Sequence, residues 1–242
     1  MAKKLTLLDL LPVTAPGILT DAMKQDMQKY LSADTQVIHT QIPNGPITIE
    51  CEYDEAFSAP EVVKLAVSTA AERPIDGIFV NCFGDPGVRP TREKITLPVF
   101  GGFEPAIYLA LGLGDKVGIV TVMKNVVPMI DAAISRAGLE RRVTSVRTLN
   151  MPVLELQDHE KLMTNLYQEC KKAIEEDHVS VLVMGCTGIV GINAEMVNRL
   201  RKDGYDIPVL EAAQCAMTLL ELYAKMGLYQ SRETYMEPPK KG

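Results

Sequence analysis

The sequence predicts an α/β fold made of two similar, mostly parallel α/β subdomains, related by a pseudo-twofold axis, with a functional site in the cleft between them. Three observations lead to this prediction. Short apolar runs of strand length alternate with stretches of helical spacing. The order of these segments repeats in the two halves of the chain, and in each half one apolar run ends in a cysteine. Because strands and helices alternate, a parallel sheet is favoured.

The candidate strands are short apolar runs, and the candidate helices are the longer periodic stretches between them. In chain order, strands are expected at residues 4–11, 36–42, 76–82, 97–102, 116–122, 143–149, 179–186 and 207–211. Helices are expected at residues 17–31, 59–72, 127–138, 159–176 and 193–204. In open α/β sheets, ligands bind beyond the carboxyl ends of the strands, so the residues that follow each strand are the candidates for a site.

The chain is expected to divide into two subdomains whose segments follow the same order. Each half has a strand with a polar end, a long helix, a second strand, another helix, a strand ending in cysteine, and a short strand that begins Leu-Pro-Val or Ile-Pro-Val. We expect one subdomain to contain residues 1–102 and 212–242, and the other to contain residues 103–211. Two such halves that face one another place Cys82 and Cys186 at strand ends across one cleft.

Composition excludes several classes of function. The 242 residues are 47% hydrophobic, enough for a substantial core. The net charge of −6 comes from 25 basic and 31 acidic residues mixed along the chain, so there is no basic stripe for nucleic acid. No apolar run approaches the roughly 20 residues that cross a bilayer, and the start of the chain is a poor secretory signal. We expect a cytoplasmic protein with no membrane partner, ending in a polar, proline-broken tail at residues 235–242.

The five cysteines form an odd number without a CxxC pair, which favours reduced thiols over a disulfide framework. Cys170 and Cys215 lie in helical patterns and are expected to pack, whereas Cys51 lies among polar neighbours and is a weaker candidate for a site. Cys82 and Cys186 each end a strand before a glycine-containing turn. For these two, the pattern alone leaves packing and chemistry equally open.

The three histidines are scattered and form neither a zinc motif nor a Cys-His pair in the sequence, although the fold could still bring such a pair together. We therefore expect no metal and no cofactor.

Two thiols at facing strand ends fit a particular reaction. A proton on a carbon next to a carbonyl can be removed from one face and replaced on the other if two groups of suitable pKa flank that carbon, and this needs no cofactor. Helix N-termini and backbone amides after a strand are expected to lower the pKa of both cysteines and to hold negative charge on the carbonyl oxygen. Gly84 and Gly87, and Thr187 and Gly188, are the candidates for this amide-lined role.

At these residues the sequence resembles the aspartate/glutamate/hydantoin racemase superfamily, and most closely its hydantoin and allantoin racemase branch. The resemblance rests on NCFGDPGV (81–88), GCTGI (185–189) and GPITIECEYDEAF (45–57), with PVFGGFEPA (98–106) and GIVTV (118–122) in matching order. It implies a two-domain α/β fold with a site between the halves. It also implies cofactor-independent racemisation by Cys82 and Cys186, a small-molecule substrate and a homo-oligomer.

The sequence departs from the hydantoin branch in ways that put the substrate in doubt. Where the branch commonly has Asn-Pro-Asn-Thr after its first strand, this chain keeps Pro12 and Thr14 but has Leu11 and Val13 in place of the asparagines. Gly84 replaces an expected acid. A site that loses amide partners for a polar ring loses discrimination for it, so a more apolar carbonyl compound becomes possible.

The candidate substrate-binding residues lie at strand ends and in the matching segments; they are Thr14, Pro46, Ile47, Phe83, Gly84, Thr121, Thr187 and Gly188. Thr14 and Thr121 could bind a carboxylate or carbonyl of the substrate, or could cap helices instead.

Two interpretations are open for several charged and polar residues. Glu50, Tyr53, Asp54 and Glu55 could form a mobile cover, although a charged loop is more often a solvated face. Arg89 and Arg92 could attract an anion, but on a helix after the Pro-Gly turn they are expected at the surface. Glu104 matches a family residue near the domain junction and could equally cap a helix.

Three other functions stay open at this stage. Two belong to the same superfamily: a decarboxylase, which needs only one catalytic thiol, and a cis-trans isomerase that uses a cysteine as nucleophile. The third is a ligand-binding protein that keeps the fold without turnover. Alkylation offers a test, because an idle buried thiol resists it, whereas a poised thiol reacts near neutral pH and is protected by ligand.

Overall fold

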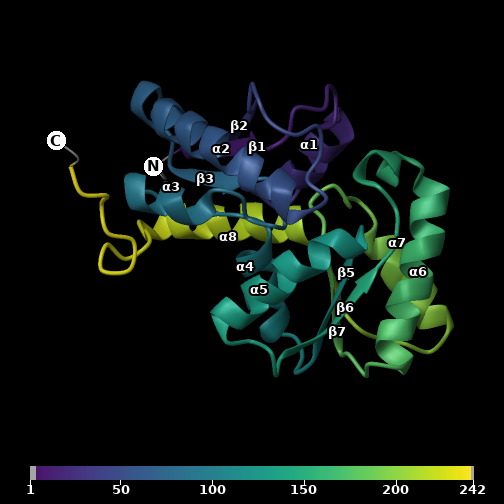
Figure 1. The fold of residues 1–242 in the computed structure, drawn as a ribbon. Coiled ribbons are helices and arrows are strands. Elements are labelled where there is room, and N and C mark those ends of the chain that lie inside the picture. The colour runs from purple at the N-terminus through teal and green to yellow at the C-terminus, as the bar shows by residue number, and fades with distance from the viewer. Residues whose placement is uncertain (1–3, 241–242) are drawn as a thin grey trace.

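The computed structural model describes residues 4–240 and contains two parallel sheets of four strands each. Their strand orders are β2-β1-β3-β4 and β6-β5-β7-β8, so the second sheet repeats the topology of the first. Figure 1 shows the two sheets in separate halves of the molecule, each flanked by its own helices. The predicted α/β fold with two similar halves is confirmed.

The first sheet contains β1 (Thr6–Leu11), β2 (Gln36–Gln41), β3 (Gly77–Val80) and β4 (Val99–Phe100), and the helices between these strands are α1 (Asp21–Gln28), α2 (Glu52–Glu72) and α3 (Val88–Lys94). The second sheet contains β5 (Val117–Thr121), β6 (Val143–Thr148), β7 (Val181–Met184) and β8 (Val209–Glu211). Its part of the chain carries α4 (Phe103–Leu111), α5 (Val127–Ala137), α6 (His159–Glu175) and α7 (Asn193–Lys202), with short 3-10 helices η1 (Lys124–Val126) and η2 (Val153–Gln157).

The last helix, α8 (Ala212–Met226), returns to the first half (Figure 1). Its buried face, which includes Met217 and Leu220, forms one apolar cluster with Leu7, Phe79 and Phe100 of the first sheet. This packing is consistent with a first subdomain that includes residues 212–242, but the boundaries at 102/103 and 211/212 stay a prediction. Residues 1–3 and 241–242 of that subdomain, and so the end of the predicted tail, lie outside the described residues.

The element boundaries differ from the predicted ones mainly at α2. It begins at Glu52 and not at residue 59, and it continues through Pro60. Three acidic residues in its first turn interact favourably with the positive end of the helix dipole, which supports the earlier start. The predicted strand at 97–102 is reduced to two residues. Helices α3, α4 and α8 were not among the predicted ranges because they are short or follow directly on a strand.

The prediction that Arg92 lies at the surface is wrong, whereas Arg89 is exposed as expected. The Arg92 side chain is 2% exposed and donates to both carboxylate oxygens of Glu104, at 3.2 and 2.5 Å, and to the carbonyl of Val99 at 2.9 Å. It also donates to the Tyr235 hydroxyl at 2.9 Å. The tail at 235–240 therefore begins at a buried side chain, because Tyr235 covers this ion pair.

Candidate active site

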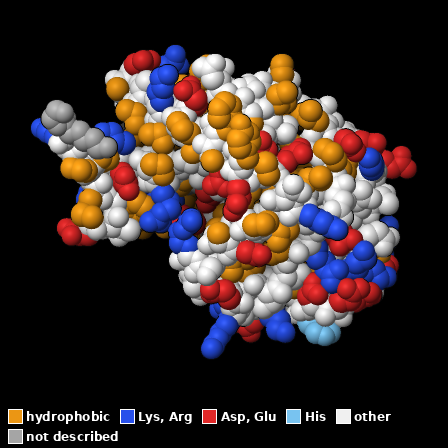
Figure 2. All heavy atoms as spheres, in the orientation of Figure 1, with side chains coloured by type: hydrophobic (Ala, Val, Ile, Leu, Met, Phe, Trp, Pro, Cys, Tyr) orange, Lys and Arg blue, Asp and Glu red, His pale blue; other side chains and the backbone are white. Residues whose placement is uncertain are grey.

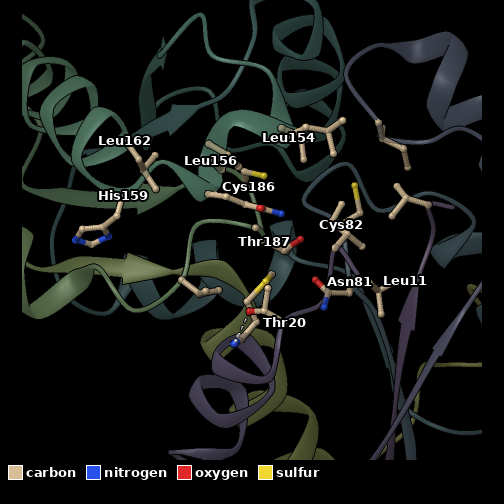
Figure 3. Close-up of a pocket in the computed structure, with 18 residues that line it drawn as sticks. Leu11, Thr20, Asn81, Cys82, Leu154, Leu156, His159, Leu162, Cys186 and Thr187 are labelled. Carbon is tan, nitrogen blue, oxygen red and sulfur yellow. Dashed lines mark hydrogen bonds between the residues drawn. The ribbon is translucent and has the colours of Figure 1, made fainter. Parts of the chain in front are cut away.

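Cys82 and Cys186 occupy equivalent places in the two sheets. Cys82 follows β3 and Cys186 follows β7, which hold the same position in the two strand orders. Both side chains line one cavity of about 320 Å³ (Figure 3), a size typical of small-molecule sites. Both also line a smaller inner cavity of about 40 Å³. The fold therefore brings together the two cysteines that the sequence singled out.

The wall of the larger cavity is mostly apolar. Its aliphatic side chains come from both halves of the chain: Leu11, Val13, Ile18, Met23, Ile49, Val153, Leu154, Leu156, Leu162 and Val190. The polar side chains in the lining, besides the cysteines, are Thr20, Asn81, Gln157, His159 and Thr187. A ligand here meets hydrocarbon on most sides, with a few polar groups to orient it.

Glycines bring backbone amides close to both sulfurs. A Cβ atom on Gly84 would lie 3.9 Å from the Cys82 Sγ, and one on Gly188 would lie 3.6 Å from the Cys186 Sγ. The amide of Gly84 stabilises a thiolate at Cys82, and the amides of Gly188 and Ile189 do the same at Cys186. The two halves thus repeat the amide arrangement as well as the cysteine.

The amides act in the expected direction, but the expected net lowering of the thiol pKa values is wrong for the ligand-free site. Burial raises the pKa of Cys82 far above its ordinary value and raises the pKa of Cys186 to about 11, since loss of water outweighs the amide hydrogen bonds. A thiolate at Cys186, and the carboxylates of Asp85 and Glu55, raise the pKa of Cys82 further. Both thiols are therefore neutral in the ligand-free protein, and slow alkylation there does not by itself indicate an idle site.

This gives a pH-dependent prediction for Cys186. Because only the thiolate is alkylated, its reaction with iodoacetamide should be slow at pH 7 and rise about tenfold per pH unit until the pH nears the thiol pKa, here about 11. Mass spectrometry of the Cys186 peptide measures the rate, and the urea-unfolded chain is the control. A plateau below about pH 9 in the folded protein, as for an ordinary thiol, would contradict the burial argument.

The other predicted site residues fall into two groups. Thr187 lines both cavities, Gly188 lines the larger one, and the inner one is lined by Phe83, Gly84 and Thr121. The Thr121 hydroxyl donates to the carbonyl of Gly185 at 2.8 Å and so holds the segment that carries Cys186.

The second group lies outside the lining of both cavities: Thr14, Pro46 and Ile47. The Thr14 hydroxyl donates to the carbonyl of Pro46 at 3.0 Å, which ties two loops together, and Ile47 is exposed. Contact of these three with substrate stays a prediction.

Asn81 is a cavity residue that the sequence reasoning missed. It directly precedes Cys82 and lines the same cavity as Leu11 and Val13, which stand where the hydantoin branch has asparagines. Its backbone amide donates to the carbonyl of Leu10 at 2.8 Å, which fixes it at the end of β3 beside β1. One side-chain amide therefore faces the cavity from the neighbouring strand (Figure 3). Its position next to a cysteine at a strand end is the sequence feature that could have indicated a cavity residue.

The segment before α2 crosses from one half of the molecule to the other. The Glu50 carboxylate accepts a hydrogen bond from the backbone amide of Val153 at 2.8 Å, and the Glu50 amide donates to Asp54 at 3.0 Å. Tyr53, Asp54 and Glu55, expected in a loop, belong to the first turns of α2 instead. Glu50 thus links the first half to η2, which forms part of the cavity wall.

His159 is the histidine that lines the larger cavity together with the two cysteines. Its ring is turned away from Cys186 (Figure 3), and its Nε2 lies 3.2 Å from Glu195 at the surface. Within residues 4–240, no cluster of three or more His, Cys, Asp or Glu side chains is suited to holding a metal ion. In the same part of the chain, no helix is long and apolar enough to span a membrane.

Known proteins resemble this chain over most of its length. A family model described as Asp/Glu/Hydantoin racemase matches residues 18–220. A hydantoin racemase from Pseudomonas sp. (strain NS671) is 31% identical over 225 residues, which cover 92% of this chain and 88% of that protein. The crystal structure of allantoin racemase from Pseudomonas fluorescens has a TM-score of 0.89 and 27% identity, and the match covers 98% of this chain and 99% of that chain.

A more distant structure shares the fold. A variant of arylmalonate decarboxylase has a TM-score of 0.65 at 19% identity, with 92% of this chain and 94% of that chain covered. The curated and structural relatives identify the protein as a racemase, which is an isomerase. The chain belongs to the Asp/Glu/hydantoin racemase family.

Proposed function

We propose that the protein racemises a hydantoin that carries an apolar substituent at its stereocentre, using Cys82 and Cys186 and no cofactor. The observation that carries this proposal is that the two thiols, from equivalent strand ends, open on one cavity of about 320 Å³ with mostly apolar walls. Membership of the racemase family supports the reaction, and a hydantoin racemase at 31% identity supports the substrate class.

In the proposed reaction, one cysteine as thiolate removes the proton from the carbon next to the ring carbonyl. The electron pair of the broken C–H bond moves onto the carbonyl oxygen, and the other cysteine, as thiol, delivers its own proton to the opposite face. The two cysteines exchange protonation states in each turnover, and the opposite enantiomer uses them in reverse. Backbone amides beside Gly84, Thr187 and Gly188 are suited to hold the charge on the oxygen.

The wall of the cavity favours an apolar substituent over the ureido group of allantoin. Leu11 and Val13 offer no hydrogen bonds, so a polar substituent placed against them would lose its contacts with water without compensation. Asn81 supplies one amide in the same wall, which can accept a ring N–H. A polar ring can therefore lie near the cysteines and Asn81, with a hydrocarbon substituent against Leu11 and Val13.

Polarimetry on single enantiomers tests the proposal. We expect 5-benzyl- or 5-isobutyl-hydantoin to lose optical rotation with a kcat/KM at least about tenfold above that for allantoin, which corresponds to about 1.4 kcal/mol of discrimination. The rate without protein is subtracted, because the stereocentre of hydantoins also exchanges its proton spontaneously.

Three results would contradict the proposal. A preference for allantoin would reverse the substrate assignment. Release of CO2 from a malonate, with no racemisation, would indicate the decarboxylase alternative, and ligand binding without any turnover would indicate a binding protein. The cytoplasmic location and the homo-oligomer stay predictions that these assays do not address.

A further inference from the structure

A second, larger hollow adjoins the inner cavity that Cys82 lines. It has a volume of about 640 Å³ and is formed by residues of α2 and α3 from the first half and of α4 and α5 from the second. Figure 2 shows acidic and basic side chains gathered where the two halves of the molecule meet on this face. We call it the charged groove. Its lining includes Glu52, Glu55, Asp85, Glu104 and Arg136.

Only a thin wall separates the charged groove from the cysteines. Gly84 and Met129 line both the groove and the inner cavity that Cys82 and Cys186 share. Since Gly84 has no side chain, it contributes only backbone to the wall beside Cys82. The remaining obstacle is the methyl end of Met129, which would lie 2.8 Å from a Cβ on Gly84 and belongs to a flexible side chain.

Glu55 and Cys82 both lie close to Gly84. The position that a Gly84 Cβ would occupy lies 3.8 Å from the Glu55 Oε2 and 3.9 Å from the Cys82 Sγ. The carboxylate and the thiol therefore each lie within 4 Å of one point that the Met129 methyl group crowds, and a small bridging group fits there once Met129 moves. Glu55 itself lies in the groove, on the first turns of α2, and is half-buried.

Of the other acids of the groove, Asp85 and Glu104 are engaged and Glu52 is exposed. Asp85 accepts a hydrogen bond from the Phe103 amide at 3.1 Å, and Glu104 is paired with Arg92. Glu52 is exposed one turn before Glu55. Burial raises the pKa of Glu55, partly offset by Arg136, so that its carboxyl group holds a proton more readily than an exposed one.

We propose that Glu55 exchanges protons between Cys82 and the water of the charged groove. The proposal rests on the proposed two-cysteine function. Through a bridging water molecule, the Glu55 carboxylate accepts the proton of the Cys82 thiol and leaves the thiolate that removes the proton from the substrate carbon. The carboxyl group then passes that proton to water in the groove. In the reverse sense, protonated Glu55 reloads a Cys82 thiolate while a ligand fills the main cavity. Glu55 acts through Cys82 and does not touch the substrate.

Cys186 has no matching arrangement among the described residues. The acid whose charge raises its pKa is Glu50, and this carboxylate is committed to the Val153 amide at 2.8 Å and the Thr48 hydroxyl at 3.3 Å. Gly188, beside Cys186, lines the main cavity and not the charged groove. Glu55 should therefore affect proton exchange at one thiol only, and a purely structural role would affect both.

The test uses single-cysteine variants in deuterated water. Cys186→Ser leaves Cys82 as the only thiol of the pair and Cys82→Ser leaves Cys186, so each is expected to exchange the hydrogen of one enantiomer with retention of configuration. Glu55→Gln should slow deuterium incorporation into 5-benzylhydantoin about tenfold in the Cys186→Ser background. In the Cys82→Ser background it should change the rate by less than about twofold. Glu52→Gln, in the same groove, is the matched control and should change either rate by less than about twofold, since its charge has only a minor influence on Glu55.

Equal slowing in both backgrounds would overturn the proposal, because it would indicate a general structural effect. No slowing in the Cys186→Ser background, with thermal unfolding unchanged by Glu55→Gln, would overturn it as well. If the parent protein racemises no hydantoin, the proposed function fails and this proposal fails with it. That outcome is distinguishable, because the loss is then already present in the unaltered chain.

Discussion

Cys82→Ser and Cys186→Ser are each expected to lower racemisation in both directions by at least about a thousandfold. A serine hydroxyl is far weaker as both acid and base than a thiol, and each turnover needs one residue on either face of the carbon. Polarimetry on both enantiomers measures the loss. In deuterated water, each variant should still exchange the hydrogen of the enantiomer that faces its remaining thiol, and the two variants should prefer opposite enantiomers.

The other cysteines supply the controls for this experiment. Cys51→Ser, Cys170→Ser and Cys215→Ser should each keep turnover per folded molecule within about tenfold of the parent, or about 1.4 kcal/mol in the barrier. Cys170 and Cys215 are buried in the core, so circular dichroism must first establish that these variants fold. Near-parental racemisation by folded Cys82→Ser or Cys186→Ser would contradict the two-cysteine assignment.

Arg92→Met is expected to have the largest effect on stability, lowering the free energy of unfolding by about 3–5 kcal/mol. The substitution leaves the partly buried Glu104 carboxylate without its ion-pair partner and removes the donors to Val99 and Tyr235. Denaturant unfolding measures the loss. Arg89→Met, at an exposed neighbouring position, is the control and should change the stability by less than about 1 kcal/mol.

A double variant separates the ion pair from simple packing. Arg92→Met combined with Glu104→Leu removes both charges, so it should recover part of the lost stability. A loss as large as the sum of the two single losses would contradict the role given to the pair. The substitution of Arg92 also removes a contact of the tail, because the Arg92 guanidinium carbon lies 5.3 Å from the centre of the Tyr235 ring.

The sequence was sufficient for the fold and for the cysteine pair because those features are local. Apolar runs of strand length and the cysteine at the end of two of them are visible in short windows, and the repeat gives their relation. Parallel topology then places strand ends together at one edge of each sheet. The sequence alone therefore predicts that Cys82 and Cys186 share one cleft, as the structure shows.

The errors concern interactions that depend on distant parts of the chain. Arg92 was expected at the surface because its neighbours Thr91 and Glu93 give no sign that Glu104 and Tyr235 come together around it. The sign of the pKa shift at the cysteines was wrong for a similar reason. Adjacent glycines suggest stabilising amides, but the apolar wall that outweighs them comes from segments as far apart as Leu11 and Leu162.

The near-repeat of the two sheets has a thermodynamic consequence if the protein is a racemase of a free chiral compound. Enantiomers have equal free energies in water, so the equilibrium constant between them is unity and kcat/KM must be identical in the two directions. The surroundings of the two thiols are nevertheless unequal. Cys82 lies next to residues that line the charged groove, whereas Cys186 lies near Glu50. That inequality can only appear as a difference in kcat that is matched by a proportional difference in KM. The enantiomer with the lower KM must therefore be the one with the lower kcat.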